Sequence, residues 1–177
     1  MKFSELHFPK APDIVVEPPG PKSKQLLDKQ REIESKAVLY PLAVPLVLEA
    51  GRGATVKDVD GNTYIDFFGG IAVLNVGHSN PFVLKAVREQ EEKLIHALDF
   101  PATPRIRLAE KLVEISPGGL KRNAKVLFGG PTGSDAVEAA IKLAKYNTKR
   151  IGVIAFEGSY AGQTGFSLAL SSAKKFK

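Results

Sequence analysis

The sequence is organised around residues 125–150, where a short apolar run passes through a tight loop into a helix. Lys125–Phe128 has the composition of a buried strand, and a Gly-Gly-Pro sequence ends it. From Gly133 onward, apolar residues recur at helical spacing, with acidic residues early and basic residues late, the order that the helix dipole favours. Such a loop leaves backbone N–H groups free to bind phosphate at the helix start, although an ordinary structural turn has the same sequence features.

A second apolar run, Ile151–Phe156, follows this helix, and the order strand–helix–strand predicts parallel strands with a right-handed crossover. Ligands of such sheets bind beyond the carboxyl ends of the strands. Because the loops at Thr132–Ser134 and Glu157–Thr164 leave the strands at that edge, we expect a phosphate-type loop beside a tyrosine-bearing loop. The buried stripe of the helix is predicted to contain Ala136, Ala140, Leu143 and Ala144, with Val137 and Ile141 beside it.

Three blocks of the sequence resemble one enzyme family. Residues 132–144, TGSDAVEAAIKLA, resemble the SGSEAxEAAxKLAR segment of class III aminotransferases, which are pyridoxal-phosphate enzymes of fold type I. Residues 154–164 resemble the family's IAFxGxYHGRT, and residues 51–81 resemble its GxGxxxxDVDGxxYIDFxxGIAVxxxGHxxP block. The blocks keep the family's order over most of residues 40–172. The resemblance implies an α/β fold, namely part of a fold type I large domain with a parallel-type sheet.

The resemblance also implies how the cofactor, pyridoxal 5′-phosphate, is held. Thr132, Gly133 and Ser134 would bind its phosphate through N–H groups and hydroxyls, and Tyr160 would stack on its pyridine ring. No catalytic residue is assigned, because the family's Schiff-base lysine, and the aspartate that pairs with the pyridine nitrogen, would lie beyond Lys177. The chain is therefore expected to be the N-terminal portion of an enzyme and to be inactive alone.

Two residues are expected on the substrate side. Ile71 occupies a substrate-contacting position of the family, with packing as its alternative role. Gln163 stands where many members have Arg; the neutral amide cannot bind a carboxylate bidentately, which argues against dicarboxylate or γ-aminobutyrate specificity. Ala161 stands where His is common. The N-terminal arm and Gln163 are more similar to archaeal members, some of which racemise amino acids.

Three functions remain open at this point. The leading one is an aminotransferase that moves an amino group between a small-molecule donor (4-aminobutyrate, ornithine or another amino acid) and a 2-oxo acid, within a homodimer as in the resembled family. The first alternative is an amino-acid racemase of the same fold, which uses the same cofactor. The second, from another class, is a non-catalytic phosphate-binding module.

Composition excludes several other classes. The 25 Lys and Arg against 19 Asp and Glu give +6, but the basic residues are dispersed, so no nucleic-acid partner is expected. There is no cysteine, which excludes disulfides and thiolate metal sites. His7, His78 and His96 lack metal-ligand spacing, so no metal is expected; His78 is predicted to be a structural hydrogen-bonding residue and His96 to lie on a helix surface. No apolar run has the length of a membrane span, and a cytoplasmic location is expected.

The chain is predicted to have three parts. Residues 1–45 form a proline-rich arm and a polar helix over 23–36. Residues 46–80 form a small antiparallel segment and a pocket loop, with Asp60-Gly61-Asn62 as a turn; turn chemistry is favoured there over a calcium loop. Residues 81–177 begin the cofactor-binding large domain, with helices over 81–98 and 105–115.

Overall fold

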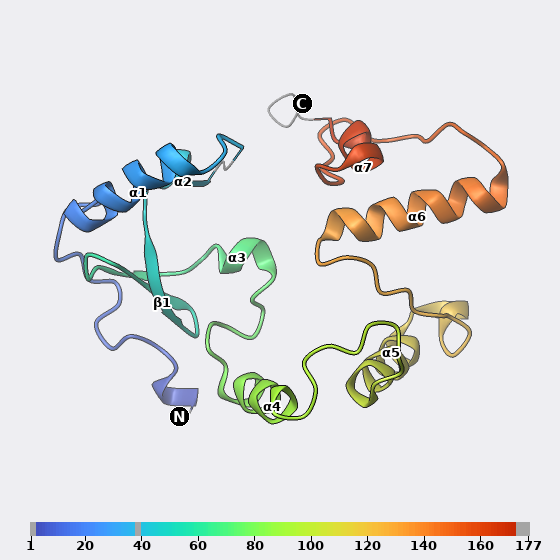
Figure 1. The fold of residues 1–177 in the computed structure, drawn as a ribbon, viewed down its shortest axis with the longest axis horizontal. Coiled ribbons are helices and arrows are strands. Elements are labelled where there is room, and N and C mark those ends of the chain that lie inside the picture. Colours follow the sequence, from blue (N-terminus) through green and yellow to red (C-terminus); the bar gives the residue numbers. More distant parts are fainter. Residues whose placement is uncertain (1–2, 38–39, 173–177) are drawn as a thin grey trace. The chain divides into compact units, whose positions relative to one another are not determined.

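The computed structural model describes residues 3–37 and 40–172 and divides into two compact units, Met1–Ala97 and Leu98–Lys177 (Figure 1). The first unit contains η1 (Phe3–Glu5), α1 (Pro21–Ile33), α2 (Tyr40–Ala43), β1 (Leu48–Arg52), β2 (Thr55–Asp58), β3 (Thr63–Ile65), α3 (Gly69–Ala72) and α4 (Pro81–Glu91). The second contains α5 (Thr103–Ile115), η2 (Gly118–Leu120), α6 (Gly133–Thr148) and α7 (Gly165–Leu170). No helix within these described residues is long and apolar enough to cross a membrane.

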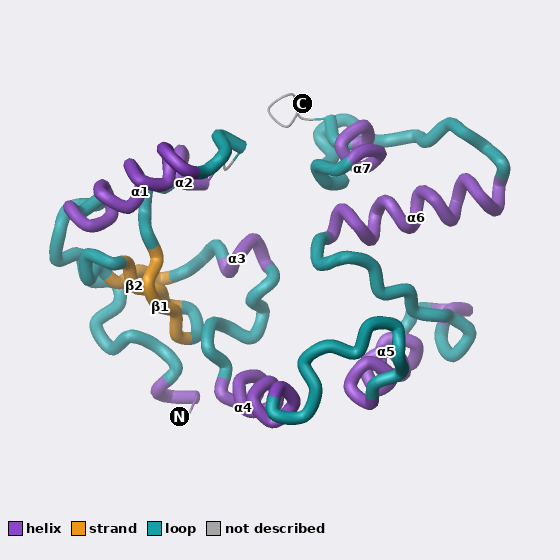
Figure 2. The backbone as a smooth tube through the Cα atoms, viewed as in Figure 1, coloured by secondary structure: helices purple, strands orange, loops and turns teal. Residues whose placement is uncertain are grey.

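The three strands form one antiparallel sheet in the order β1-β2-β3, which confirms the small antiparallel segment predicted within residues 46–80 (Figure 2). Val56 on β2 is the buried apolar side chain of this sheet. The N-terminal arm extends the pairing, because Asp13 and Thr63 exchange two backbone hydrogen bonds of 2.9 Å. The sheet therefore fixes a segment that is distant in sequence.

The turn between β2 and β3 is built on two fully buried polar side chains, Asp58 and Asn62. The Asp58 carboxylate accepts hydrogen bonds from the Asn62 backbone N–H at 2.9 Å, from Asn62 Nδ2 at 2.8 Å and from the Tyr64 hydroxyl at 2.8 Å. Asn62 Oδ1 accepts from the backbone N–H groups of Val15 and Val16 at 2.8 and 2.9 Å. These side chains act in the turn, as the sequence predicts.

Asp60, in the same turn, caps the start of α1. Its carboxylate oxygens accept from the backbone N–H groups of Lys22 and Ser23 at 2.9 Å, where a negative charge complements the helix dipole. Burial acts to raise the pKa of Asp60, but the hydrogen bonds from Ser23 and Lys22 outweigh it and hold that pKa below its usual value. The predicted polar helix thus forms, two residues earlier than expected.

Helix α4 is shorter than the predicted helix over 81–98. Asn80 caps it, accepting from the Phe82 N–H at 3.0 Å, and the helix ends at Glu91. The apolar Ile95, which the periodicity places on a buried face, is 87% exposed. Beyond Glu91 the chain turns: the N–H groups of Lys93 and Leu94 both donate to the Gln90 carbonyl at 3.0 Å, and Gln90 Nε2 donates to the Leu94 carbonyl at 2.9 Å. His96 therefore lies outside the helix, and its predicted placement was wrong.

The parallel strands predicted at 125–128 and 151–156 do not form; both segments lie outside strands in the structure. Leu127 is 75% exposed and Ile154 is 93% exposed. A strand exists only where a neighbour accepts and donates its backbone hydrogen bonds, and the described part of the chain offers these two segments no such neighbour. The predicted mixture of helices and strands is therefore confirmed, but the sheet of the described residues is the small antiparallel one and not the predicted parallel one.

Helix α6 begins at Gly133, as predicted, and has 16 residues, but the buried face differs from the predicted stripe. Ile141 is its buried residue, whereas Leu143 is 62% exposed. Ile141 lies on the same face of α6 as Ser134 and Glu138, which hydrogen-bond to residues 163–167, whereas Leu143 lies on the opposite side of the helix.

Candidate functional site

Thr132 caps the start of α6 together with Asp135. The Thr132 hydroxyl accepts from the Asp135 N–H at 3.3 Å and donates to Asp135 Oδ2 at 2.8 Å, and Oδ2 also accepts from the Thr132 N–H at 3.0 Å. This reciprocal capping box fixes the direction in which the chain enters the helix. The structure thus gives the Thr132 side chain a capping role, and its contact with a phosphate stays a prediction.

Gly133 and Ser134 are the first two residues of α6, and the N–H groups at such positions have no acceptor within the helix. A methyl group added at Gly133 would meet no atom within 4 Å, so the space beside Gly133 is open. The positive end of the helix dipole favours an anion there. Although Asp135 brings a negative charge nearby, its Oδ2 is already bonded to Thr132. The donors present fit a phosphate group.

The loop that carries Tyr160 and Gln163 contacts the start of α6. The Gln163 backbone N–H donates to Ser134 Oγ at 3.2 Å. Gly162, with φ of 132°, lies so close that a side chain there would overlap Ser134 Oγ. Because the Ser134 oxygen accepts from Gln163, its own O–H can still donate to an anion. The structure therefore brings together two residues that the sequence predicts for the site.

The same loop is folded back onto the end of α7. The Ala161 N–H donates to Ser171 Oγ at 3.0 Å, and that hydroxyl donates to the Gly162 carbonyl at 2.9 Å. Tyr160 precedes these contacts and exposes 59% of its surface. Tyr160 is thus an exposed residue on a loop whose following residues are held by hydrogen bonds.

Ile71 belongs to the other unit, where Gly69–Ala72 forms a left-handed turn with φ between 53° and 62°. A β-branched residue rarely adopts this conformation, because its Cβ crowds the following carbonyl. Ile71 has φ of 62° and is 54% exposed, so only about half of its surface is buried. Backbone strain of this kind often marks functional sites, which agrees with the predicted substrate role without testing it.

Asp66 holds the start of this turn, and the sequence analysis did not single it out. Its Oδ1 accepts from the N–H groups of Phe68 and Gly69 at 2.9 Å, and its Oδ2 lies 2.8 Å from His78 Nε2. The hydrogen bond from His78 is the main reason why the pKa of Asp66 lies below its usual value. His78 is therefore the structural hydrogen-bonding residue that the sequence predicts, and the spacing of twelve residues gave no sign of its partner.

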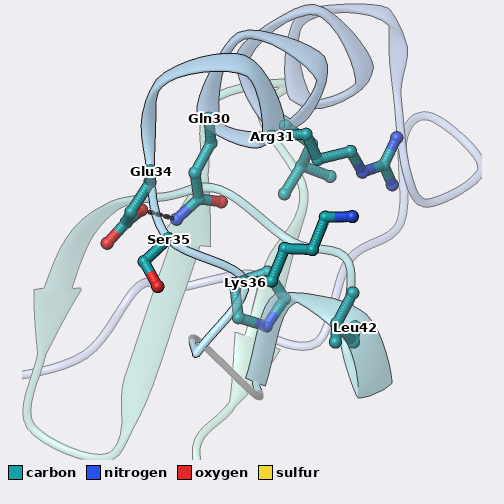
Figure 3. A pocket seen from close by; sticks show the side chains of 8 residues that line it. Gln30, Arg31, Glu34, Ser35, Lys36 and Leu42 are labelled. Carbon is teal, nitrogen blue, oxygen red and sulfur yellow. Dashed lines mark hydrogen bonds between the residues drawn. The ribbon is translucent and has the colours of Figure 1, made fainter.

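A partly open pocket lies elsewhere, between α1 and α2 (Figure 3). It has a volume of about 280 Å³ and is lined by Leu27 and Leu42 together with the charged Arg31 and Lys36. Arg31 is paired with Asp28 at 2.6 Å. None of the residues predicted to bind cofactor or substrate lines this pocket.

Residues 40–177 match the family described as aminotransferase class-III. This range is most of the chain, and it includes every predicted site residue. The chain belongs to the class III aminotransferases. Members of this family depend on pyridoxal 5′-phosphate and use amino acids and oxo acids as substrates. The phosphate-type helix start and the tyrosine-bearing loop are thus parts of a class III aminotransferase sequence.

Two curated relatives and one solved structure illustrate the likeness. The class III chain is 46% identical to an alanine/serine racemase of Pyrococcus horikoshii, over 86% of this chain and 32% of the relative. It is 38% identical to a diaminobutyrate–2-oxoglutarate aminotransferase of Rhizobium meliloti, over 81% of this chain and 31% of the relative. A transaminase structure from the marine bacterium Virgibacillus superposes with a TM-score of 0.74 at 26% identity, over 86% of this chain and 37% of that one. The chain spans about a third of the length of the curated relatives it matches.

Proposed function

We propose that this chain supplies the part of a class III enzyme that binds the phosphate of pyridoxal 5′-phosphate and borders the substrate, in an aminotransferase that acts on an amino acid and a 2-oxo acid. The observation that carries the proposal is the 3.2 Å contact between Ser134 Oγ and the Gln163 N–H. It joins an anion-binding helix start to a loop with an accessible aromatic ring. A ligand with a phosphate at one end and a ring at the other matches both.

Each residue has a separate task in this proposal. Gly133 and Ser134 donate backbone N–H groups to the phosphate, and the Ser134 hydroxyl adds a third donor. Tyr160 stacks on the cofactor ring and orients it. Gln163 presents a neutral amide to the substrate, with Ile71 as an apolar contact. Bound pyridoxal 5′-phosphate supplies the electron sink that makes bonds at the substrate α-carbon reactive.

Racemisation is the second candidate reaction. It is favoured by the 46% identity to the alanine/serine racemase of Pyrococcus horikoshii. Gln163 fits a small neutral amino acid as well, because no guanidinium at that position would select a second carboxylate. An aminotransferase needs an oxo acid to accept the amino group, whereas a racemase does not.

The cofactor site can be tested on the 177-residue chain itself. Pyridoxine 5′-phosphate carries the ring and the phosphate but no aldehyde, so it does not react with surface lysines. We expect it to bind at least tenfold more tightly than pyridoxine, and Ser134→Ala to weaken it about tenfold, the loss of one hydrogen bond to a charged group. Ser35→Ala, an exposed serine of the other unit, is the control. Equal binding of both probes would contradict the phosphate site.

The substrate preference needs a complete enzyme, for example a chimera in which this chain replaces the matching third of the Pyrococcus horikoshii racemase. Gln163→Arg should raise kcat/KM for a dicarboxylic amino acid over an apolar one by about ten- to a hundredfold, the equivalent of one charge-assisted hydrogen bond of roughly 1.5–3 kcal/mol. An unchanged ratio would show that Gln163 does not contact substrate. Loss of optical rotation without an oxo acid would identify racemisation.

Homodimer formation by the complete enzyme is part of the proposal, supported by the family resemblance. Many large apolar side chains of the described residues are exposed, among them Phe67 at 95% and Ile95 at 87%. Surfaces of this kind tend to be covered in the functional state. Sedimentation of the complete enzyme as a monomer would contradict it. The 177-residue chain alone should turn over no amino donor, because in the resembled family the reactive lysine lies outside the range it covers.

A further inference from the structure

Glu138 joins α6 to the segment that follows the tyrosine-bearing loop. Its Oε1 atom accepts one hydrogen bond from the Thr164 hydroxyl and another from the Ser167 backbone N–H, both at 2.9 Å. Thr164 is the N-cap of α7 and Ser167 is the third residue of that helix, so one carboxylate oxygen holds the whole first turn. The Ser167 N–H is also the main reason why the pKa of Glu138 lies below its usual value.

Two more contacts lie on the same face of α6. Ser134 Oγ accepts from the Gln163 N–H, and Lys145 Nζ lies 4.1 Å from the centre of the Phe166 ring. With 3.6 residues per turn, positions 134, 138 and 145 fall within about 40° of one another around the helix axis. This face therefore fixes residues 163–167 at three points, and Glu138 is the middle one.

We propose that Glu138 is a positioning residue, which holds the loop bearing Tyr160 and Gln163 at a set distance from the phosphate-binding start of α6. This inference rests on the proposed function. The phosphate and the ring belong to one compact ligand. Both can be bound at once only if the loop stays at a fixed distance from the start of α6. Glu138 acts through Thr164 and Ser167 and does not itself contact the cofactor.

Three variants separate this role from a general structural one. Glu138→Ala removes the acceptor of both hydrogen bonds, whereas Glu138→Gln keeps an acceptor oxygen at the same place. Glu114→Ala is the matched control, because Glu114 is an exposed glutamate of α5 whose side chain contacts Lys111 at 2.9 Å. The probes are pyridoxine 5′-phosphate, which needs both contacts, and inorganic phosphate as its competitor, which needs only the helix start.

We expect Glu138→Ala to weaken pyridoxine 5′-phosphate binding at least tenfold and to change the inhibition constant of phosphate less than twofold. Glu138→Gln should stay within threefold of wild type at pH 7, and Glu114→Ala should match wild type. Amide hydrogens of residues 157–167 should exchange at least tenfold faster in Glu138→Ala, with exchange in α5 unchanged. Thr164→Val, which removes one of the two hydrogen bonds, should show a smaller loss in the same direction.

Equal weakening of both ligands in Glu138→Ala would overturn the inference, because Glu138 would then support the helix start itself. Unchanged binding of both ligands would overturn it as well. In either case wild-type binding would leave the proposed function standing. A wild-type chain that binds neither ligand would overturn the proposed function, and the inference with it.

Discussion

Two regions of the chain are predicted to form strands, yet only one of them forms a sheet. Residues 46–68 fold into β1, β2 and β3, while 125–128 and 151–156 remain outside strands. In the first region the partner of each strand is the next segment, reached through a short turn. In the second, a parallel partner would lie across the whole of α6. Antiparallel strands close on themselves locally, whereas a parallel pair needs further strands and a long crossover.

The polar turn explains why residues 46–68 form their sheet without strands from elsewhere in the chain. Asp58 and Asn62 are fully buried, and together they satisfy backbone groups of the turn and of the N-terminal arm. The apolar runs of the second region have no equivalent: Ile151 is 88% exposed and Phe156 is 81% exposed. Four experiments test this difference between the two regions.

The largest effect is expected from Asp58→Ala. It leaves the Asn62 N–H and the Tyr64 hydroxyl without their acceptor, and unsatisfied buried groups of this kind cost about 1–3 kcal/mol each. The free energy of opening β2 and β3, measured by native-state hydrogen exchange, should fall by about 3 kcal/mol. Asp28→Ala removes an exposed ion pair with Arg31 and should change it by less than about 0.5 kcal/mol. Equal effects would show that the turn does not hold the sheet.

A direct comparison of the two regions comes from truncating one apolar residue in each. Val56 is 8% exposed and Ile154 is 93% exposed. Val56→Ala should destabilise its unit by about 2 kcal/mol, and Ile154→Ala should change stability by less than about 0.5 kcal/mol. Urea unfolding of both variants gives the two values. A large effect at Ile154 would mean that residues 151–156 are packed in solution and would remove the contrast.

A smaller effect concerns the ionisation of Tyr64. Burial and the hydrogen bond to Asp58 raise its pKa to about 12. The neutral form is therefore favoured in the folded state, and the stability this contributes is complete below pH 10 and is lost as the pH rises through 12. The difference in tyrosinate absorbance between wild type and Tyr64→Phe should show a step near pH 12. In Asp58→Asn that step should move towards pH 10; an unmoved step would remove Asp58 as a cause.

The smallest effect is expected at Ile71. Asn tolerates φ of 62° better than a β-branched residue, and Ile71 is 54% exposed, so Ile71→Asn should stabilise the first unit by up to about 1 kcal/mol. Val73→Asn, at an ordinary φ of −98°, is the control and should not stabilise. Thermal unfolding measures both. Destabilisation by Ile71→Asn would show that the packing of this side chain outweighs the strain of its backbone.

Some features were determined by the sequence alone, because each depends on neighbours within a few residues. The Asp60-Gly61-Asn62 turn, the start of α6 at Gly133 and the three family blocks all belong to this kind. The start of α4 after Asn80 does so too, since the cap and the following proline are adjacent.

Only the tertiary structure decided the rest, because it depends on which surfaces meet. Ile141 rather than Leu143 is buried, on the face of α6 whose Glu138 bonds to the start of α7, and α4 ends at Glu91 with Ile95 exposed beyond it. The partnership of Asp66 with His78, and of Glu138 with Thr164 and Ser167, joins residues 12 to 29 positions apart, beyond the reach of any local pattern. The segments 125–128 and 151–156 also depend on distant contacts. Their apolar pattern indicates burial, but a strand forms only where a neighbouring segment shares its backbone hydrogen bonds.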